Sequence, residues 1–343
     1  MKQVPGYTLV RTEDCPEQHG TLTVLTHDVS GATILLVENE DNNKAFGIGF
    51  GTFPSDDTGV FHILEHSVLA GSEKYPVTSP FLQLLKSSMA SFLNAMTFPD
   101  KTVYPFATPN ETDFGNLMDV YLNAVFCPLA MVDRAVFEQE GWHRDADGTV
   151  SGVVYNEMKG ALSEPDSVLY DGLSAALFPD TTYRFESGGT PAAIPTLTYE
   201  GFLENHRRHY RPDNAYIILY GNLDADRFLG FLDERYLAPL AAKERGPLDI
   251  NPLGLQAPVA PEPVVVPMAT APENACAAVG FVIGRAAERE RIVAADILMD
   301  AIMGANESPL KRALLDAGIA DDAIGYVADS VAQPFAVVSL RGA

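Results

Sequence analysis

The stretch Val60-Phe61-His62-Ile63-Leu64-Glu65-His66-Ser67-Val68-Leu69 contains two histidines and a glutamate within five residues. Its apolar residues recur at helical spacing, and Gly71 follows as a stop signal, so the stretch is predicted to form a helix. Asp56, Asp57 and Thr58 are candidate N-caps for this helix. The sequence therefore predicts a largely apolar helix that carries three polar side chains.

The spacing of the two histidines suits metal binding. Residues four apart on a helix lie one above the other, so His62 and His66 can direct two imidazole nitrogens at one ion. Glu65 lies on the flank of the same face, where it can reach a water on the ion without binding the ion itself. This arrangement is the inverted form of the zincin motif. Two unrelated histidines are the alternative, but the chain has only seven histidines, so the zinc interpretation is favoured.

A catalytic zinc site usually has three protein ligands and leaves a fourth position for water, so one more ligand is needed. The acidic residues downstream that could supply it are Glu138, Glu140, Glu157 and Glu164. The residues alone leave this choice open.

Strands and helices alternate irregularly along the first two thirds of the chain. β-rich runs separated by turn residues predict strands at 21–27, 32–38, 45–50, 91–96, 103–107 and 215–221. Helical patterns occur at 80–88, 111–126, 153–162 and 199–210. This order predicts an α+β domain whose helices pack against one face of a sheet.

A chain of 343 residues is long enough for two domains. Seven prolines lie between residues 246 and 272, which indicates a linker. We predict a first domain over 1–245, a proline-rich linker over 246–263, and the start of a second domain over 264–343.

The second domain is predicted to contain a strand at 277–283 and helices at 288–303 and 309–317. The predicted strand at 45–50 is likewise followed by the helix with the histidine motif. This suggests a pseudo-repeat in which the second copy lacks the motif. Because about 80 residues are few for a domain, we expect the second one to be truncated.

The chain is strongly acidic, with 23 Lys and Arg residues against 46 Asp and Glu residues. This balance argues against a nucleic-acid partner, because phosphate binding needs a positive surface. An acidic surface would attract basic ligands, although solubility alone also explains it.

Three scattered cysteines, Cys15, Cys127 and Cys276, indicate no disulfide framework and fit a reducing compartment. The N-terminus has no signal-peptide or transit pattern, and no stretch reaches the length of a transmembrane helix. We therefore expect a cytoplasmic protein that is not embedded in a membrane.

Residues 61–72 resemble the active-site helix of the insulinase family of zinc metallopeptidases. Other segments resemble its presequence-protease branch, among them Ser91-Phe92-Leu93-Asn94-Ala95-Met96-Thr97 and the residues at 73–76, 138–142, 152–160, 187–189 and 209–212. These segments follow the family order up to about Gly221. The chain is identified as a member of that branch that matches its N-terminal part only, with the αβ fold of insulinase and mitochondrial processing peptidase domains.

This resemblance implies a Zn²⁺ cofactor and a role for Glu65 as the general base. It implies Glu157 as the third metal ligand, whereas the spacing of the wider family points nearer to Glu140, which is the fallback. Asn94 and Ala95 match the strand that, in the family, lies beside the zinc and pairs with the substrate backbone. An ordinary half-buried strand is the alternative for these two residues.

The resemblance also implies endoproteolysis of unstructured, possibly basic, peptides such as presequences. In the family a second half of the molecule supplies an Arg and a Tyr near the scissile bond, and no residue of this chain can be assigned to that pair. We therefore expect the chain to bind zinc but to cleave poorly without the C-terminal half of the same protein or a partner chain.

Three other functions fit the residues less well. A non-catalytic partner subunit is disfavoured by the intact His62, Glu65 and His66. A small zinc lyase of the S-ribosylhomocysteine type would have a much shorter chain. A structural zinc site would normally be closed by Cys or His, and none of the cysteines lies near the motif in sequence.

Overall fold

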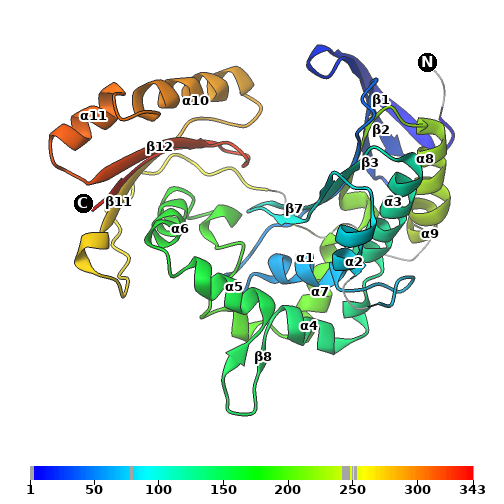
Figure 1. Cartoon of the computed structure of the whole chain (residues 1–343), viewed down its shortest axis with the longest axis horizontal. Coiled ribbons are helices and arrows are strands. Elements are labelled where there is room, and N and C mark those ends of the chain that lie inside the picture. The colour runs from blue at the N-terminus through cyan, green and yellow to red at the C-terminus, as the bar shows by residue number, and fades with distance from the viewer. Residues whose placement is uncertain (1–3, 78–79, 242–247, 249, 251–252, 343) are drawn as a thin grey trace.

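The computed structural model describes residues 4–77, 80–241, 248, 250 and 253–342. The chain forms a large eight-stranded sheet and a separate three-stranded sheet, each with helices beside it (Figure 1). Among these described residues, no helix is both long and apolar enough to span a bilayer.

The large sheet has the strand order β1-β2-β3-β10-β4-β7-β5, and β6 also pairs with β7. Neighbouring strands are antiparallel except β10 and β3, which are parallel. The strands are β1 (Tyr7–Cys15), β2 (Gly20–His27), β3 (Thr33–Glu38), β4 (Lys44–Gly51), β5 (Phe92–Leu93), β6 (Met96–Thr97), β7 (Lys101–Thr108) and β10 (Ala215–Gly221).

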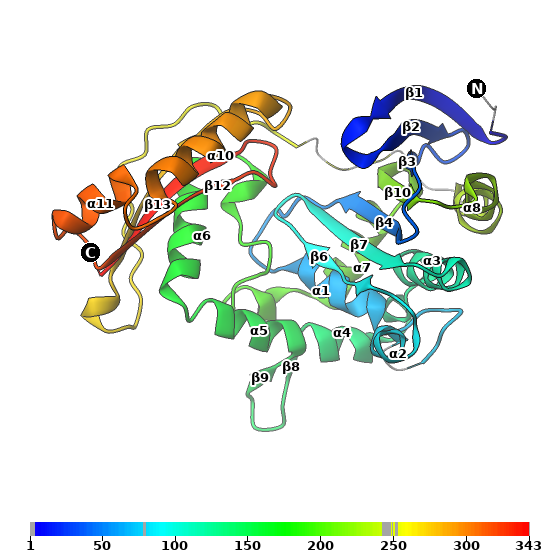
Figure 2. The same cartoon turned by 45° about the horizontal axis from the view of Figure 1, so that its top comes forward.

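One face of this sheet forms the main core. Successive residues of a strand point to opposite faces, and in β10 Ile217 and Leu219 are buried while Tyr216 and Ile218 are exposed. Helices α1 (Val60–Leu69) and α3 (Glu111–Phe126) pack on the sheet, and α7 (Tyr199–His209) packs on α1 (Figure 2). The predicted α+β class, with helices against one face of a sheet, is confirmed.

Further helices surround this core. They are α2 (Pro80–Ser87), α4 (Arg134–Glu140), α5 (Val153–Ala161), α6 (Pro165–Leu177), α8 (Ala225–Leu232) and α9 (Ala238–Ala241), with a π-helical turn at Asp233–Leu237 between the last two. A short hairpin of β8 (His143–Arg144) and β9 (Val150–Ser151) precedes α5.

The small sheet has the order β11-β13-β12, from β11 (Cys276–Val282), β12 (Asp322–Ala328) and β13 (Phe335–Arg341). Helices α10 (Arg289–Met303) and α11 (Pro309–Asp316) connect β11 to β12. In this sheet the last strand, β13, lies between the other two. The large sheet contains a similar succession of β4, α1, α2, β5, β6 and β7, in which β7 lies between β4 and β5. The predicted domain boundaries stay predictions, and part of the linker at 246–263 lies outside the described residues.

Several elements differ from expectation. Strand β1 and helices α4, α6 and α8 were not predicted. Most residues of helix α6 are only partly buried, and Leu177 is its one residue in the core. A helix that buries so little needs no strong apolar stripe, so its sequence gives little helical signal. The strand expected at 91–96 is split into β5 and β6, with Asn94 and Ala95 between them.

The helix with the histidine motif begins differently from the prediction. Its N-cap is Gly59, which adopts a left-handed conformation, and none of the described side chains caps it. Asp56 instead accepts a hydrogen bond from the backbone of Thr58, and Asp57 accepts one from the backbone N–H of Glu186. The carboxylate of Asp57 therefore ties a distant loop to the start of α1.

Candidate metal centre

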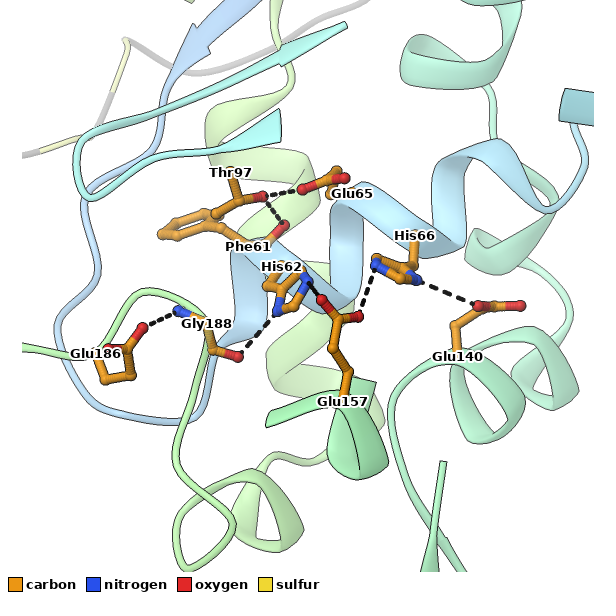
Figure 3. Close-up of polar contacts among 9 residues, drawn as sticks. All are labelled: Phe61, His62, Glu65, His66, Thr97, Glu140, Glu157, Glu186 and Gly188. Carbon is orange, nitrogen blue, oxygen red and sulfur yellow. Dashed lines mark hydrogen bonds and ion pairs between the residues drawn. The ribbon is translucent and has the colours of Figure 1, made fainter. Parts of the chain in front are cut away.

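Helix α1 is held on several sides by apolar contacts. Phe61, Ile63, Leu64 and Val68 are almost fully buried, and the helix packs against α3, α4, α5 and α7. This packing fixes the helix in rotation, so that His62 and His66 project together toward α5 (Figure 3). The two imidazole rings lie 4.9 Å apart between centroids.

Glu157 reaches the two histidines from helix α5. Its Oε1 lies 3.8 Å from Nε2 of His62, and its Oε2 lies 3.6 Å from Nε2 of His66. Val154 and Met158 are buried and anchor the helix, while Glu157 remains exposed at the site. Among the described residues, these three side chains form the group with metal-ligand spacing, and their ligand atoms all lie within 4.8 Å of one another.

The start of α5 depends on a close backbone approach. Gly152 has φ 151°, and a Cβ at this position would lie 2.1 Å from the carbonyl oxygen of Gly141. A side chain at residue 152 would push α5 away from the segment that follows α4. The glycine pair therefore helps to set the distance between Glu157 and the histidines.

The second nitrogen of each imidazole also has a partner. Nδ1 of His62 lies 3.1 Å from the carbonyl oxygen of Gly188, and Nδ1 of His66 lies 3.7 Å from Oε2 of Glu140. A carbonyl oxygen only accepts, so this contact favours the tautomer in which Nδ1 of His62 carries the proton and Nε2 has the lone pair. Partners of the ring nitrogen that does not face the metal orient metal-binding histidines.

The loop that carries Gly188 is fixed from two directions. The N–H of Gly188 donates to Oε1 of Glu186, and the N–H of Glu186 donates to Oδ1 of Asp57. Gly59 has φ 64°, and a Cβ there would lie 2.4 Å from the carbonyl oxygen of Gly188. The glycine at the start of α1 thus allows the loop to approach His62.

The carboxylates around His66 shift its pKa. Burial disfavours the protonated ring, but the contacts with Glu140, Glu65 and Glu157 outweigh burial and raise the pKa of His66 above its usual value. Protons therefore compete with a metal for this nitrogen up to a higher pH than for an ordinary histidine.

Glu65 lies outside the group of three possible ligands. Its Oε2 accepts a hydrogen bond of 2.6 Å from the hydroxyl of Thr97 on β6 (Figure 3). Its role as the general base stays a prediction.

Asn94 and Ala95 lie between β5 and β6, at an edge of the large sheet. Asn94 is exposed, its N–H donates to the carbonyl oxygen of Pro105, and its side-chain Oδ1 accepts from the N–H of Ala95. Their role in substrate binding stays a prediction.

The donor set fits zinc. Two ligand atoms at about 2.0–2.1 Å from a tetrahedral zinc lie about 3.4 Å apart. Different oxygens of Glu157 make the two contacts, Oε1 with Nε2 of His62 at 3.8 Å and Oε2 with Nε2 of His66 at 3.6 Å, and the ligand atoms of the three residues all lie within 4.8 Å of one another. Two neutral imidazoles and one carboxylate are a usual catalytic set, with one position left for water. Glu140, the fallback ligand, lies on the Nδ1 side of His66 instead.

Two family models match most of the chain. The model for insulinase (peptidase family M16) covers residues 47–186, which include His62, His66 and Glu157, and the model for the peptidase M16 inactive domain covers residues 196–340. The chain belongs to the insulinase family of peptidases.

The curated relatives include Protein HypA of Clostridium perfringens, which is 42% identical over 98% of this chain and 36% of its own length. Presequence protease 1 of Arabidopsis thaliana is 48% identical over 67% of this chain and 22% of its own length. The mitochondrial presequence protease of Mus musculus is 34% identical over 94% of this chain and 32% of its own length. The chain thus spans about a third or less of these relatives, and it resembles the presequence-protease branch.

Two solved structures share the fold. Pitrilysin superimposes with a TM-score of 0.65 at 16% identity, over 98% of this chain and 35% of its own. A protease from Helicobacter pylori superimposes with a TM-score of 0.68 at 15% identity, over 94% of this chain and 75% of its own.

Some residues of this site were not singled out from the sequence. Gly188 belongs to a segment that carries the family resemblance, yet it acts here through its backbone carbonyl, which any residue possesses. Thr97 likewise ends a recognised segment, but a threonine in a strand gives no sign of a carboxylate partner. Contacts of this kind become visible only when the elements are packed together.

Proposed function

We propose that this chain carries the active site of a zinc endopeptidase that hydrolyses unstructured peptides of the presequence type. The observation that supports it most is the convergence of His62, His66 and Glu157, with Glu65 beside them on the same helix as the histidines. Zinc bound by these three residues would lower the pKa of a coordinated water and polarise the scissile carbonyl.

The side chains of the chain itself would supply the remaining steps. Glu65 would take a proton from the attacking water and pass it to the leaving amine. Gly188 and Glu140 would hold His62 and His66 with their Nε2 atoms facing Glu157. An extended peptide would add as a strand at the edge formed by β5 and β6, where Asn94 and Ala95 lie.

The paired test is zinc content and cleavage of a quenched peptide for wild type and Glu65→Gln. Both proteins should bind about one zinc per chain, while Glu65→Gln should cleave about 10²- to 10⁴-fold more slowly because the general base is lost. Glu138→Gln is the matched control, since Glu138 is an exposed partner of Arg134 on α4. The peptidase proposal fails if wild type binds zinc but cleaves nothing even with a C-terminal half supplied.

We also propose that basic peptides are preferred. The chain has a formal charge of -23, which attracts cations over a long range. Near His62, burial and then repulsion from Asp171 and Asp57 raise the pKa of Glu186, so negative charge is crowded on this side. The kcat/KM for a basic peptide should exceed that for a matched acidic peptide, and this difference should shrink as salt is added. Equal rates at all ionic strengths would remove this proposal.

Full activity is proposed to require a C-terminal half, from the same protein or from a partner chain. The supporting fact is that the chain spans about a third or less of the curated relatives described above. The 343-residue chain is expected to bind zinc and to cleave slowly, and an added C-terminal half should raise kcat. Fast turnover by the chain alone would contradict this.

A further inference from the structure

The hydroxyl of Thr97 is directed at the carboxylate of Glu65. Its Oγ1 lies 2.6 Å from Oε2 of Glu65 and 3.5 Å from the carbonyl oxygen of Phe61 (Figure 3). An ionised carboxylate only accepts hydrogen bonds, so the threonine donates, and the shorter contact is the one to Glu65. We propose that Thr97 is a positioning residue that holds Oε2 of Glu65 and leaves Oε1 free to accept a proton from the attacking water.

The position of Thr97 is fixed before it meets Glu65. The residue ends β6, where it pairs with Thr102 of β7 in antiparallel register. A hydrogen bond of 2.8 Å from the N–H of Phe98 to the carbonyl oxygen of Lys101 closes the turn that follows. Because a β-branched side chain has few χ1 rotamers, the hydroxyl direction is largely set by the strand.

Glu65 has more freedom and gains more from such a contact. A glutamate loses considerable rotamer entropy when it is held in one orientation. The buried hydroxyls nearby do not provide this contact: those of Tyr104 and Tyr210 bond to each other at 2.8 Å. Within the described part of the chain, Thr97 is the side chain that hydrogen-bonds the Glu65 carboxylate. It therefore keeps the base in one orientation between turnovers.

A double-mutant cycle on the metal-free chain tests the contact without any turnover. Thr97→Val keeps the shape of the side chain and removes the hydroxyl, and it should raise the unfolding equilibrium constant about tenfold or more, as expected for a hydrogen bond to a charged group. In a Glu65→Ala background the same substitution should change the constant by less than about twofold. Thr97→Ser, which keeps the hydroxyl, should have a small effect. An equal effect of Thr97→Val in both backgrounds would overturn the proposal.

Kinetics provide the second readout, and this part rests on the proposed peptidase function. Thr97→Val should lower kcat about ten- to a hundredfold with little change in KM or zinc content, because a misplaced base slows proton transfer. Thr97→Ser should recover most of the rate. If wild type cleaves and Thr97→Val cleaves equally fast, the positioning role is wrong while the peptidase function stands. If wild type cleaves nothing even with a C-terminal half supplied but the cycle shows coupling, the contact is supported and the peptidase function fails.

Discussion

Replacing Glu157 by Gln should weaken zinc binding far more than replacing Glu140 by Gln. Glu157 faces Nε2 of both histidines at 3.8 and 3.6 Å, whereas Glu140 contacts Nδ1 of His66 at 3.7 Å. Loss of an outer partner costs about 10- to 100-fold in metal affinity, which is about 1.4–2.7 kcal/mol. Glu157→Gln should exceed this range, because it removes a ligand and its negative charge together.

Zinc affinity can be measured by competition with a chromophoric chelator at fixed pH. The side chain of Glu157 is 53% exposed, so its substitution should leave the urea midpoint of the metal-free chain nearly unchanged. Glu138→Gln, on the same helix as Glu140, should bind zinc as wild type does. The reasoning is refuted if Glu140→Gln abolishes zinc binding while Glu157→Gln leaves it within about tenfold of wild type, because Glu140 would then be the ligand.

Two further predictions concern the support of helix α1. Burial, helped by the charge of Arg208, lowers the pKa of His209 to about 4 in the folded chain, compared with about 6.5 in the unfolded chain. The neutral ring therefore contributes stability above pH 6.5, and this stability is lost as the pH falls toward 4. Urea unfolding should show a loss of about 3 kcal/mol from this residue across that window, and His209→Gln should flatten the decline. Gly59→Ala should destabilise the chain by about 1–3 kcal/mol and weaken zinc binding, because its Cβ would meet the carbonyl of Gly188 at 2.4 Å in a left-handed backbone. Gly160→Ala, in a helix with open space around it, should be neutral or slightly stabilising in the same assays.

The sequence by itself determined the features that depend on residues close together in the chain. The helical spacing of His62, Glu65 and His66 follows from the helix period, and the structure places both imidazoles on one side of α1. The mixed order of strands and helices likewise predicted the α+β class. These inferences succeed because periodicity is a local property, encoded within a few helical turns.

Short or weakly patterned elements were harder to predict. Helix α4 has only seven residues and one buried side chain, Phe137, so it produces little periodic signal. The break between β5 and β6 places Asn94 outside a regular strand, although its backbone still bonds to Pro105. Such details depend on what lies on either side of the segment.

Only the tertiary structure shows that Glu157 faces the Nε2 atoms of both histidines while Glu140 faces Nδ1 of His66, because both are acidic residues on short helices that follow the motif. The close approach of Gly152 to Gly141 sets α5 against α1 and brings Glu157 to the Nε2 atoms. The carbonyl of Gly188 meets His62 across 126 residues of sequence. A backbone carbonyl has no signature in the sequence, and a carboxylate has the same chemistry wherever it stands, so their roles are assigned by the packing of distant segments.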